Sequence, residues 1–386
     1  MTQTEGSAAP FLGKPRCDLQ TIFEGQRFPN VVVSMRGTVL ATWGSQSYWV
    51  RRSLDGGATW EPAIEVARPG FHGGGTLVDE RHDTILVFNE GEHPPKTPQK
   101  TMGRLEVYRS RDDGRRWERI EVTIQPDPNG YIPARHMCEH GITLRHSLHS
   151  GRLLRPARVY DKLGDKPRGY SCAIYSDDGG RNWKSSRPFP ESGTGESGVV
   201  ELANGDIYHN SRKHYFDAAA SDFHSRRHAT WSYNGGESWQ DVVTVNELPD
   251  GPRYRGEERR GSNYNGHFGM LAGLVRLPVE GRDILLYSNA DTPCHNRIRG
   301  TVWISFDGGK SWPMKRLVYE GPFAYSSLTA GWPGTPSEGW IYLQFEGGVE
   351  NCYDGGWIAR FNLNWLLGGQ ATGDGEVPVW ITAEEL

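Results

Sequence analysis

The sequence predicts an all-β fold, a six-bladed β-propeller closed by its N- and C-terminal strands. The first supporting observation is an octet with the pattern Ser-x-Asp-x-Gly-x-x-Trp, which we call the Asp box. It occurs five times at intervals of about 55 to 75 residues, close to the blade length expected of a radial repeat. The copies are SLDGGATW (53–60), SRDDGRRW (110–117), SDDGGRNW (176–183), SYNGGESW (232–239) and SFDGGKSW (305–312).

The second observation is a strand-like run directly before each box. These runs alternate apolar or aromatic residues with polar ones over four to six positions, which is typical of β-strands. They read SYWVRR, LEVYR, SCAIY, HATW and GTVWI. Counting strands along the whole chain gives about six blades for five boxes. The last blade must then pair N-terminal with C-terminal strands, which removes the open edges of the ring.

The box itself predicts a self-fastening turn. Ser and Asp side chains accept or donate hydrogen bonds to nearby backbone groups, and Gly adopts the positive φ that a tight turn needs. The Trp then buries a large apolar area. We therefore expect the boxes to lie on the outer rim and to touch no substrate. Asn204-Gly205 predicts a further hairpin, and the one short helix expected lies near Leu363–Leu367.

The chain has 386 residues, rich in Gly (49), Tyr (16) and Trp (14), which fits many short strands joined by tight turns. No Pro-, Ser- or charge-rich linker divides it. We expect an irregular lead-in over residues 1–20, a single propeller over 21–370 and a C-terminal tail over 371–386.

Charge and hydropathy exclude several classes of partner. The net charge is −4, and acidic and basic residues are interleaved, so no nucleic-acid partner is expected. No run of 18 apolar residues exists, so no membrane span is expected. No signal peptide is visible, which favours a cytoplasmic protein over a secreted one whose signal has been trimmed. Nothing in the sequence indicates an oligomeric state.

Metal and redox sites are not expected either. The five cysteines are scattered and form no CxxC pair, which favours free thiols. His136 and His140 flank Glu139, but a third ligand is not apparent. We therefore predict no metal and no cofactor.

Several polar residues stand at the ends of predicted strands, where the loops of a propeller converge on its central channel. Arg27, Arg212 and Arg297 come from three different blades, and three convergent arginines would bind a carboxylate by charge-assisted contacts. Taken singly, each would be an ordinary surface arginine. Tyr325 and Glu196 stand at strand starts. A glutamate can act as base to a tyrosine hydroxyl, and an uncharged nucleophile suits a substrate that already carries a carboxylate.

These motifs together resemble the exo-α-sialidases (neuraminidases), which are six-bladed propellers with Asp boxes. The resemblance covers roughly residues 24–365. Arg27-Phe28-Pro29 is similar to the family's Arg-Ile-Pro motif. The other matching segments are Glu196-Ser-Gly-Val-Val-Glu-Leu202, Asn210-Ser-Arg212, Ala324-Tyr325-Ser326 and Glu346 in LQFEGG.

The resemblance implies a retaining exo-glycoside hydrolase that releases a terminal 2-keto sugar acid, sialic acid or a related nonulosonic acid, from a glycoconjugate or oligosaccharide. It implies that Arg27, Arg212 and Arg297 bind the carboxylate, with Arg299 as a competitor for the third position. It also implies that Tyr325 is the nucleophile, that Glu196 is its partner and that Glu346 orients Arg27. Arg158 and Tyr160 are expected to line the pocket and contact distal groups of the substrate.

One segment departs from the family pattern. The general acid of the family is an Asp in the loop before the first box, but here that loop, residues 43–48, contains no Asp, Glu or His. We predict His72 as the substitute, because it starts the next inner strand and an imidazolium can donate a proton near neutral pH. Glu92 and His93 are the alternative acids.

The altered loop keeps two other hypotheses open. The chain could be a glycosidase for a different acidic sugar, such as a Kdn- or Kdo-like sugar or a uronic acid. It could also be a non-catalytic carbohydrate-binding propeller, because Asp boxes are scaffold features that occur with unrelated functions. The Tyr325–Glu196 pair argues against the non-catalytic alternative.

Overall fold

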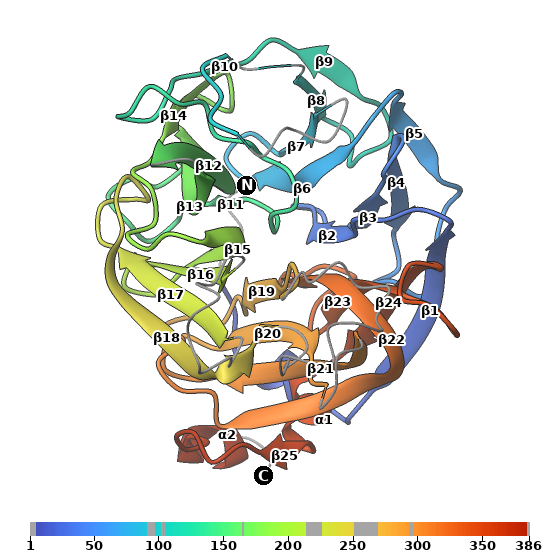
Figure 1. Ribbon diagram of the computed structural model, residues 1–386. Helices are drawn as coiled ribbons and strands as arrows, with labels where there is room; N and C mark the ends of the chain where they lie inside the picture. The colour runs from blue at the N-terminus through green and yellow to red at the C-terminus, as the bar shows by residue number, and fades with distance from the viewer. Residues whose placement is uncertain are drawn as a thin grey trace.

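The computed structural model describes residues 5–90, 97–101, 103, 105–163, 166–213, 226–250, 269–292 and 297–383. Its sheets are arranged radially around a central axis, as Figure 1 shows. This confirms the predicted all-β, propeller-like architecture. In the described part of the chain, no helix is both long and apolar enough to cross a membrane.

The first four sheets follow the chain in order. The first contains β2 (Asn30–Val33), β3 (Val39–Trp43), β4 (Tyr48–Ser53) and β5 (Ile64–Ala67). The second contains β6 (His72–Asp79), β7 (Thr84–Asn89), β8 (Glu106–Ser110) and β9 (Glu118–Ile120). The third contains β10 (Thr123–Ile124), β11 (Ile142–Thr143), β12 (Leu153–Leu163), β13 (Lys166–Ser176) and β14 (Asn182–Ser185). The fourth contains β15 (Thr194–Glu201), β16 (Ile207–Lys213), β17 (Arg226–Ser232) and β18 (Gln240–Pro249).

The remaining strands form one sheet of eight, held together by the long strand β22 (Met314–Ala330). The first part of β22 pairs with β21, and its last part pairs with β23. The other members are β19 (Gly273–Arg276), β20 (Leu285–Ala290), β21 (Ile298–Ser305), β23 (Ile341–Gly347), β24 (Gly355–Phe361), β1 (Cys17–Glu24) and β25 (Gln370–Ala371).

The chain ends meet in this sheet, because β1 pairs antiparallel with β24 from Cys17 opposite Phe361 to Glu24 opposite Gly355. This is the predicted pairing of N- and C-terminal strands. In the other units the fourth strand follows the third strand directly along the chain, whereas β24 and β1 lie near opposite ends of the chain. No hairpin turn joins them, which explains why this position has no Asp box.

The five boxes directly follow the strands β4, β8, β13, β17 and β21. The predicted turn chemistry is present in them. In the third copy, the Ser176 hydroxyl donates to Asp178 Oδ1 (2.8 Å) and accepts from Gly180 N–H (3.0 Å). Asp178 Oδ1 also accepts from Asn182 N–H (2.9 Å), and Trp183 Nε1 donates to the Gly180 carbonyl (2.9 Å). In the fourth copy the Asn234 amide oxygen accepts the same bonds from Ser232 and Ser238. The turn therefore needs an acceptor oxygen, not a charge.

Apolar side chains between neighbouring sheets form the core. The second and third sheets, for example, enclose Leu86, Phe88, Ile174 and Trp183, all at most 1% exposed. Because similar clusters lie between the other adjacent sheets, each sheet is positioned by its neighbours around the ring.

Short helices lie at the two ends of the chain. The predicted helix is present as α1 (Leu363–Leu367), and Asn362 caps it by accepting from Trp365 N–H. A 3₁₀ turn, Ala9–Phe11, and a second helix, α2 (Val379–Ala383), were not predicted from the sequence. Both are too short for hydrophobic periodicity to be recognised.

Trp183→Ala should lower the free energy of unfolding by about 3–5 kcal/mol, because it removes a fully buried indole between two sheets. Urea unfolding followed by far-UV circular dichroism measures this. The matched control is Trp117→Ala, since Trp117 makes the same Nε1 bond to Gly114 but is only half-buried. Equal losses for both variants would contradict the argument from burial.

Candidate active site

The predicted site residues lie at one edge of the inner strands. Successive strands of a sheet run in opposite directions, so the start of one strand lies beside the end of the next. Arg27 precedes β2 and Glu196 lies near the start of β15, whereas Arg212 and Glu346 lie near the ends of β16 and β23. Tyr325 lies where β22 begins to pair with β23. The fold therefore brings five side chains, each on or next to a different strand, to one face of the ring.

Arg27 and Glu346 form a bidentate ion pair. Arg27 Nε and Nη2 donate to the two carboxylate oxygens at 3.0 and 3.1 Å. The N–H groups of Phe28 (3.0 Å) and Tyr325 (3.4 Å) also donate to Glu346. Phe28 has a positive φ of 68°, which turns its N–H toward this carboxylate. Glu346 is fully buried while the Arg27 side chain remains 31% exposed, so Arg27 is held rigidly with one side accessible.

Tyr325, Glu196 and Arg212 form a second buried cluster. The Tyr325 hydroxyl donates to Glu196 Oε1 at 2.7 Å. Arg212 Nη1 donates to Glu196 Oε2 at 2.6 Å and to Tyr325 Oη at 3.4 Å. This is the arrangement of a nucleophile beside a base whose second oxygen is held by a cation.

The electrostatic environment of Tyr325 has opposing contributions. Burial raises the pKa of its hydroxyl well above the ordinary range, and the nearby Glu196 carboxylate raises it further. Arg212, Arg297 and Arg27 act in the opposite direction and lower the pKa of Tyr325. The resting hydroxyl is therefore protonated, and its proton can pass along the 2.7 Å bond to Glu196.

Arg297 lies beside this cluster, and its competitor Arg299 does not. The Arg297 guanidinium carbon lies 5.4 Å from the centre of the Tyr325 ring, and Arg297 Nη1 donates to Tyr353 Oη at 3.1 Å. Arg299 adopts a positive φ of 63° and is paired with Glu320 at the surface. The structure therefore places Arg297, and not Arg299, with Arg27 and Arg212.

Arg158 approaches Glu196 from the third sheet, and Tyr160 lies beside Arg158. Arg158 Nη1 lies 3.9 Å from Glu196 Oε1, and Arg158 Nη2 contacts His136 Nε2. The guanidinium carbon lies 5.9 Å from the centre of the Tyr160 ring. Residues 158 and 160 lie two apart on β12 and so share one face of that strand.

The surroundings of His72 argue against the predicted role as proton donor. Its backbone does lie next to loop 43–48, since His72 N–H donates to the Gly44 carbonyl at 2.9 Å. The ring, however, is 1% exposed, stacks on Tyr48 and contacts Thr42 Oγ1 at 3.0 Å. Burial, reinforced by the positive charge of Arg155, lowers the pKa of His72 to about 3. An imidazolium is therefore not populated there near neutral pH, and we withdraw His72 as the acid.

The alternative acids Glu92 and His93 lie outside the described residues.

Among the described residues, no group of three His, Cys, Asp or Glu side chains could hold a metal ion. Both ring nitrogens of His140 contact backbone carbonyls, those of Gly141 and Leu328.

Several site residues had not been identified from the sequence. Tyr353 contacts both Arg297 and Arg27, with the Arg27 guanidinium carbon 4.0 Å from its ring centre. It lies in a turn without a motif, so no local pattern marks it. The other missed residues are two fully buried ion pairs behind the site, Arg135–Glu90 and Arg227–Asp250.

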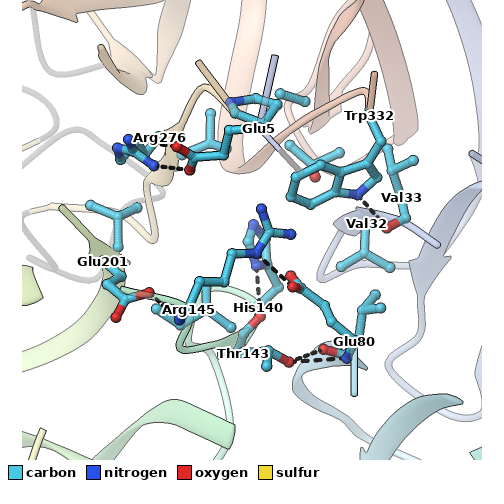
Figure 2. Close-up of a pocket in the computed structure, with 18 of the residues that line it drawn as sticks. Glu5, Val32, Val33, Glu80, His140, Thr143, Arg145, Glu201, Arg276 and Trp332 are labelled. Atoms are coloured by element: carbon cyan, nitrogen blue, oxygen red, sulfur yellow. Dashed lines mark hydrogen bonds and ion pairs between the residues drawn. The ribbon is translucent and has the colours of Figure 1, made fainter. Parts of the chain in front are cut away.

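The opposite face of the ring holds a separate cavity of about 110 Å³, shown in Figure 2. It lies at the other ends of the inner strands, around Val33, Glu80, Arg145 and Trp332. Arg145 Nε donates to Glu80 at 2.6 Å, and the Arg145 guanidinium carbon lies 3.9 Å from the Trp332 ring centre. Because no Tyr–carboxylate pair lines it, this cavity offers no comparable nucleophile.

Comparison with known proteins assigns the chain to a family. Residues 49–335 match the family model for the BNR repeat-like domain. The chain belongs to this family.

Its relatives include sialidases. The chain is 31% identical over 374 residues to a sialidase of Micromonospora viridifaciens, covering 90% of this chain and 53% of that protein. It is 24% identical over 349 residues to a sialidase of Bacteroides fragilis, covering 78% of this chain and 57% of that protein. The chain therefore spans just over half the length of these curated relatives. The solved structure of Hadza microbial sialidase Hz136 has the same fold, with a TM-score of 0.66 and 24% identity over 89% of this chain and 66% of that chain.

The buried, neutral His72 makes a testable contribution to pH stability. The lowered pKa means that the unfolded chain takes up a proton near pH 6.5 and the folded chain does not, so stability falls as pH decreases below that value. Between about pH 7.5 and pH 5.5, the decrease in unfolding free energy should be about 1.4 kcal/mol smaller in His72→Gln than in the wild type. Urea unfolding at both pH values measures it. His149→Gln, on a surface turn, is the control, and an unchanged decrease in His72→Gln would contradict the pKa assignment.

Proposed function

We propose that this protein is a sialidase-like exo-glycoside hydrolase that releases a terminal 2-keto sugar acid, sialic acid or a related nonulosonic acid. The observation that carries the proposal is the buried Tyr325–Glu196–Arg212 cluster beside the rigidly held Arg27. The named sialidase relatives support it.

In the proposed complex, Arg27, Arg212 and Arg297 bind the substrate carboxylate. Their guanidinium groups surround the Tyr325 ring, with the carbons of Arg27 and Arg297 at 5.5 and 5.4 Å from its centre. A carboxylate held there places the adjacent anomeric carbon over Tyr325 Oη. The substrate carboxylate does not repel a neutral tyrosine. It would repel a carboxylate nucleophile, because both groups are negatively charged.

In the first chemical step, Tyr325 Oη forms a bond to the anomeric carbon while its proton passes to Glu196. The bond from that carbon to the leaving oxygen breaks, and the general acid protonates that oxygen. In the second step a water molecule attacks the same carbon and gives a proton to the conjugate base of the acid. The tyrosyl oxygen leaves and recovers its proton from Glu196. Two displacements at one carbon retain its configuration. Glu92 and His93 remain the candidate acids.

We also infer that the fold has six blades. The eight-stranded sheet divides at β22 into the unit β19–β20–β21–β22 and the unit β22–β23–β24–β1, which together with the four smaller sheets makes six. On this interpretation the propeller extends over residues 21–370, with residues 1–20 as lead-in and 371–386 as tail.

Tyr325→Phe should reduce kcat/KM for the best substrate by about a hundredfold or more, because it removes the attacking oxygen while preserving the ring. Tyr342→Phe is the matched control, since Tyr342 is buried and its hydroxyl has no hydrogen-bond partner among the described residues. Hydrolysis of a fluorogenic glycoside measures both. Full activity in Tyr325→Phe would exclude this residue as the nucleophile.

The substrate class is tested with methylumbelliferyl glycosides of sialic acid, Kdn, Kdo and glucuronic acid. We expect turnover of a 2-keto acid glycoside and little or no turnover of the glucuronide, whose carboxylate is not attached to the anomeric carbon. Preferred turnover of the glucuronide would favour the alternative of a uronic acid substrate. Saturable binding of a free sugar acid without any turnover would indicate the non-catalytic, carbohydrate-binding alternative.

A further inference from the structure

Among the described residues, the buried and half-buried arginines in and around the site outnumber the carboxylates that pair with them. Four arginines each have a carboxylate within 3.0 Å. These pairs are Arg27–Glu346, Arg135–Glu90, Arg212–Glu196 and Arg227–Asp250. Arg158 is a further buried arginine of the same region, with a side chain 2% exposed.

In the described part of the chain, Arg158 has no carboxylate of its own. The nearest is Glu196, whose Oε1 lies 3.9 Å from Arg158 Nη1 and already accepts the Tyr325 hydroxyl at 2.7 Å. The other oxygen of Glu196 is held by Arg212 at 2.6 Å. Arg158 Nη2 contacts His136 Nε2, and Arg158 Nε is buried without a hydrogen-bond partner among the described residues.

Burial of a guanidinium in this state raises the free energy of the folded protein, because the charge loses its hydration. Only a closely bound anion and satisfied N–H groups offset that loss. The sharing of one carboxylate by two guanidinium groups and a hydroxyl leaves the region with excess positive charge. A ligand that brings an anion to Arg158 would remove that excess. Arg158 also presents a planar fork of donors suited to carboxylate, sulfate or phosphate.

The position of Arg158 identifies which part of a ligand it would meet. Arg27 and Arg297 are linked through Tyr353, on the side of β21 to β24. Arg158 lies on β12, which is across the ring from β22, β23 and β24 in Figure 1. Because Glu196 stands between Arg212 and Arg158, a sugar whose carboxylate lies over Arg27, Arg212 and Arg297 directs its far side toward Arg158.

We propose that Arg158 binds a second acidic group of the ligand. The preferred ligand is then a sugar acid with a carboxylate, sulfate or phosphate on the side remote from its first carboxylate. This inference rests on the proposed function, since it assumes that the first carboxylate is held by Arg27, Arg212 and Arg297.

The test compares the binding of 2-deoxy-2,3-dehydro-sialic acid with that of two dianionic analogues. One carries a carboxylate made by oxidation of the glycerol side chain, and the other carries an O-sulfate on that chain. Isothermal titration calorimetry at fixed ionic strength gives the three Kd values. We expect the wild type to bind the better dianion about ten- to a hundredfold more tightly than the monoanion, as for a charge-assisted hydrogen-bonded pair. The two dianionic arms distinguish a carboxylate from a sulfate as the second group.

Arg158→Gln should abolish this preference, and Arg158→Lys should keep part of it, because lysine retains the charge without the fork. Arg81→Gln, an exposed arginine after β6, removes the same charge and should leave the preference unchanged. If Arg158→Gln does not fold, the Kd values of the wild type for the monoanion and the two dianions are the test of the inference. Equal affinities of the wild type for all three ligands, or a preference that survives in Arg158→Gln, would overturn the inference.

The outcomes separate this inference from the proposed function. Binding of the monoanion to the wild type, lost in Arg27→Ala, supports the first carboxylate site. If that binding occurs and the dianions bind no better, only the second acidic group is excluded, and Arg158 serves to hold Glu196. If no ligand binds the wild type, both proposals fall.

Discussion

The antiparallel pairing of β1 with β24 is the constraint on which the site depends. It joins the two ends of the chain, so that the segment after β1 lies next to β23 and β22. Arg27 follows β1 and β2 follows Arg27, while Glu346 and Tyr325 come from the last third of the sequence. Only a closed ring holds Arg27 against Glu346 at 3.0 Å. Apolar side chains of β1, β2, β3 and β24 pack together at that closure.

The electrostatics of the site follow from burial. Burial raises the pKa of Tyr325, so the hydroxyl is held neutral until its proton can pass to Glu196. Arginines around the ring oppose that rise and also create the positive environment that suits the proposed anionic ligand. Carboxylates such as Glu346 hold individual arginines in place. Their number is too small to neutralise every arginine, and this imbalance leads to the inference about Arg158.

His72 shows where reasoning from the sequence reaches its limit. The position of its backbone was predicted correctly, because the start of an inner strand must lie beside the loop that precedes the first box. The direction of its side chain was not predicted correctly, because a shift of one residue in a strand turns a side chain to the other face. The register of β6 with β7 changes between His72 and Thr76, so alternation along the strand could not be followed through it. The ring is buried against Thr42 and Tyr48.

The sequence by itself determined the all-β repeat, the turn chemistry of the Asp boxes and the strand ends at which Arg27, Arg212 and Glu196 lie. Those features are local, since they depend on residue types within about ten positions of one another. Tyr325 was expected at a strand start but lies inside the long strand β22. The tertiary structure alone placed Arg297, and not Arg299, beside Tyr325 and brought Tyr353 to the site. It also left Arg158 without its own carboxylate among the described residues. These outcomes depend on distances between residues far apart in the chain, and such distances are set by sheet packing and ring closure, which no local pattern encodes.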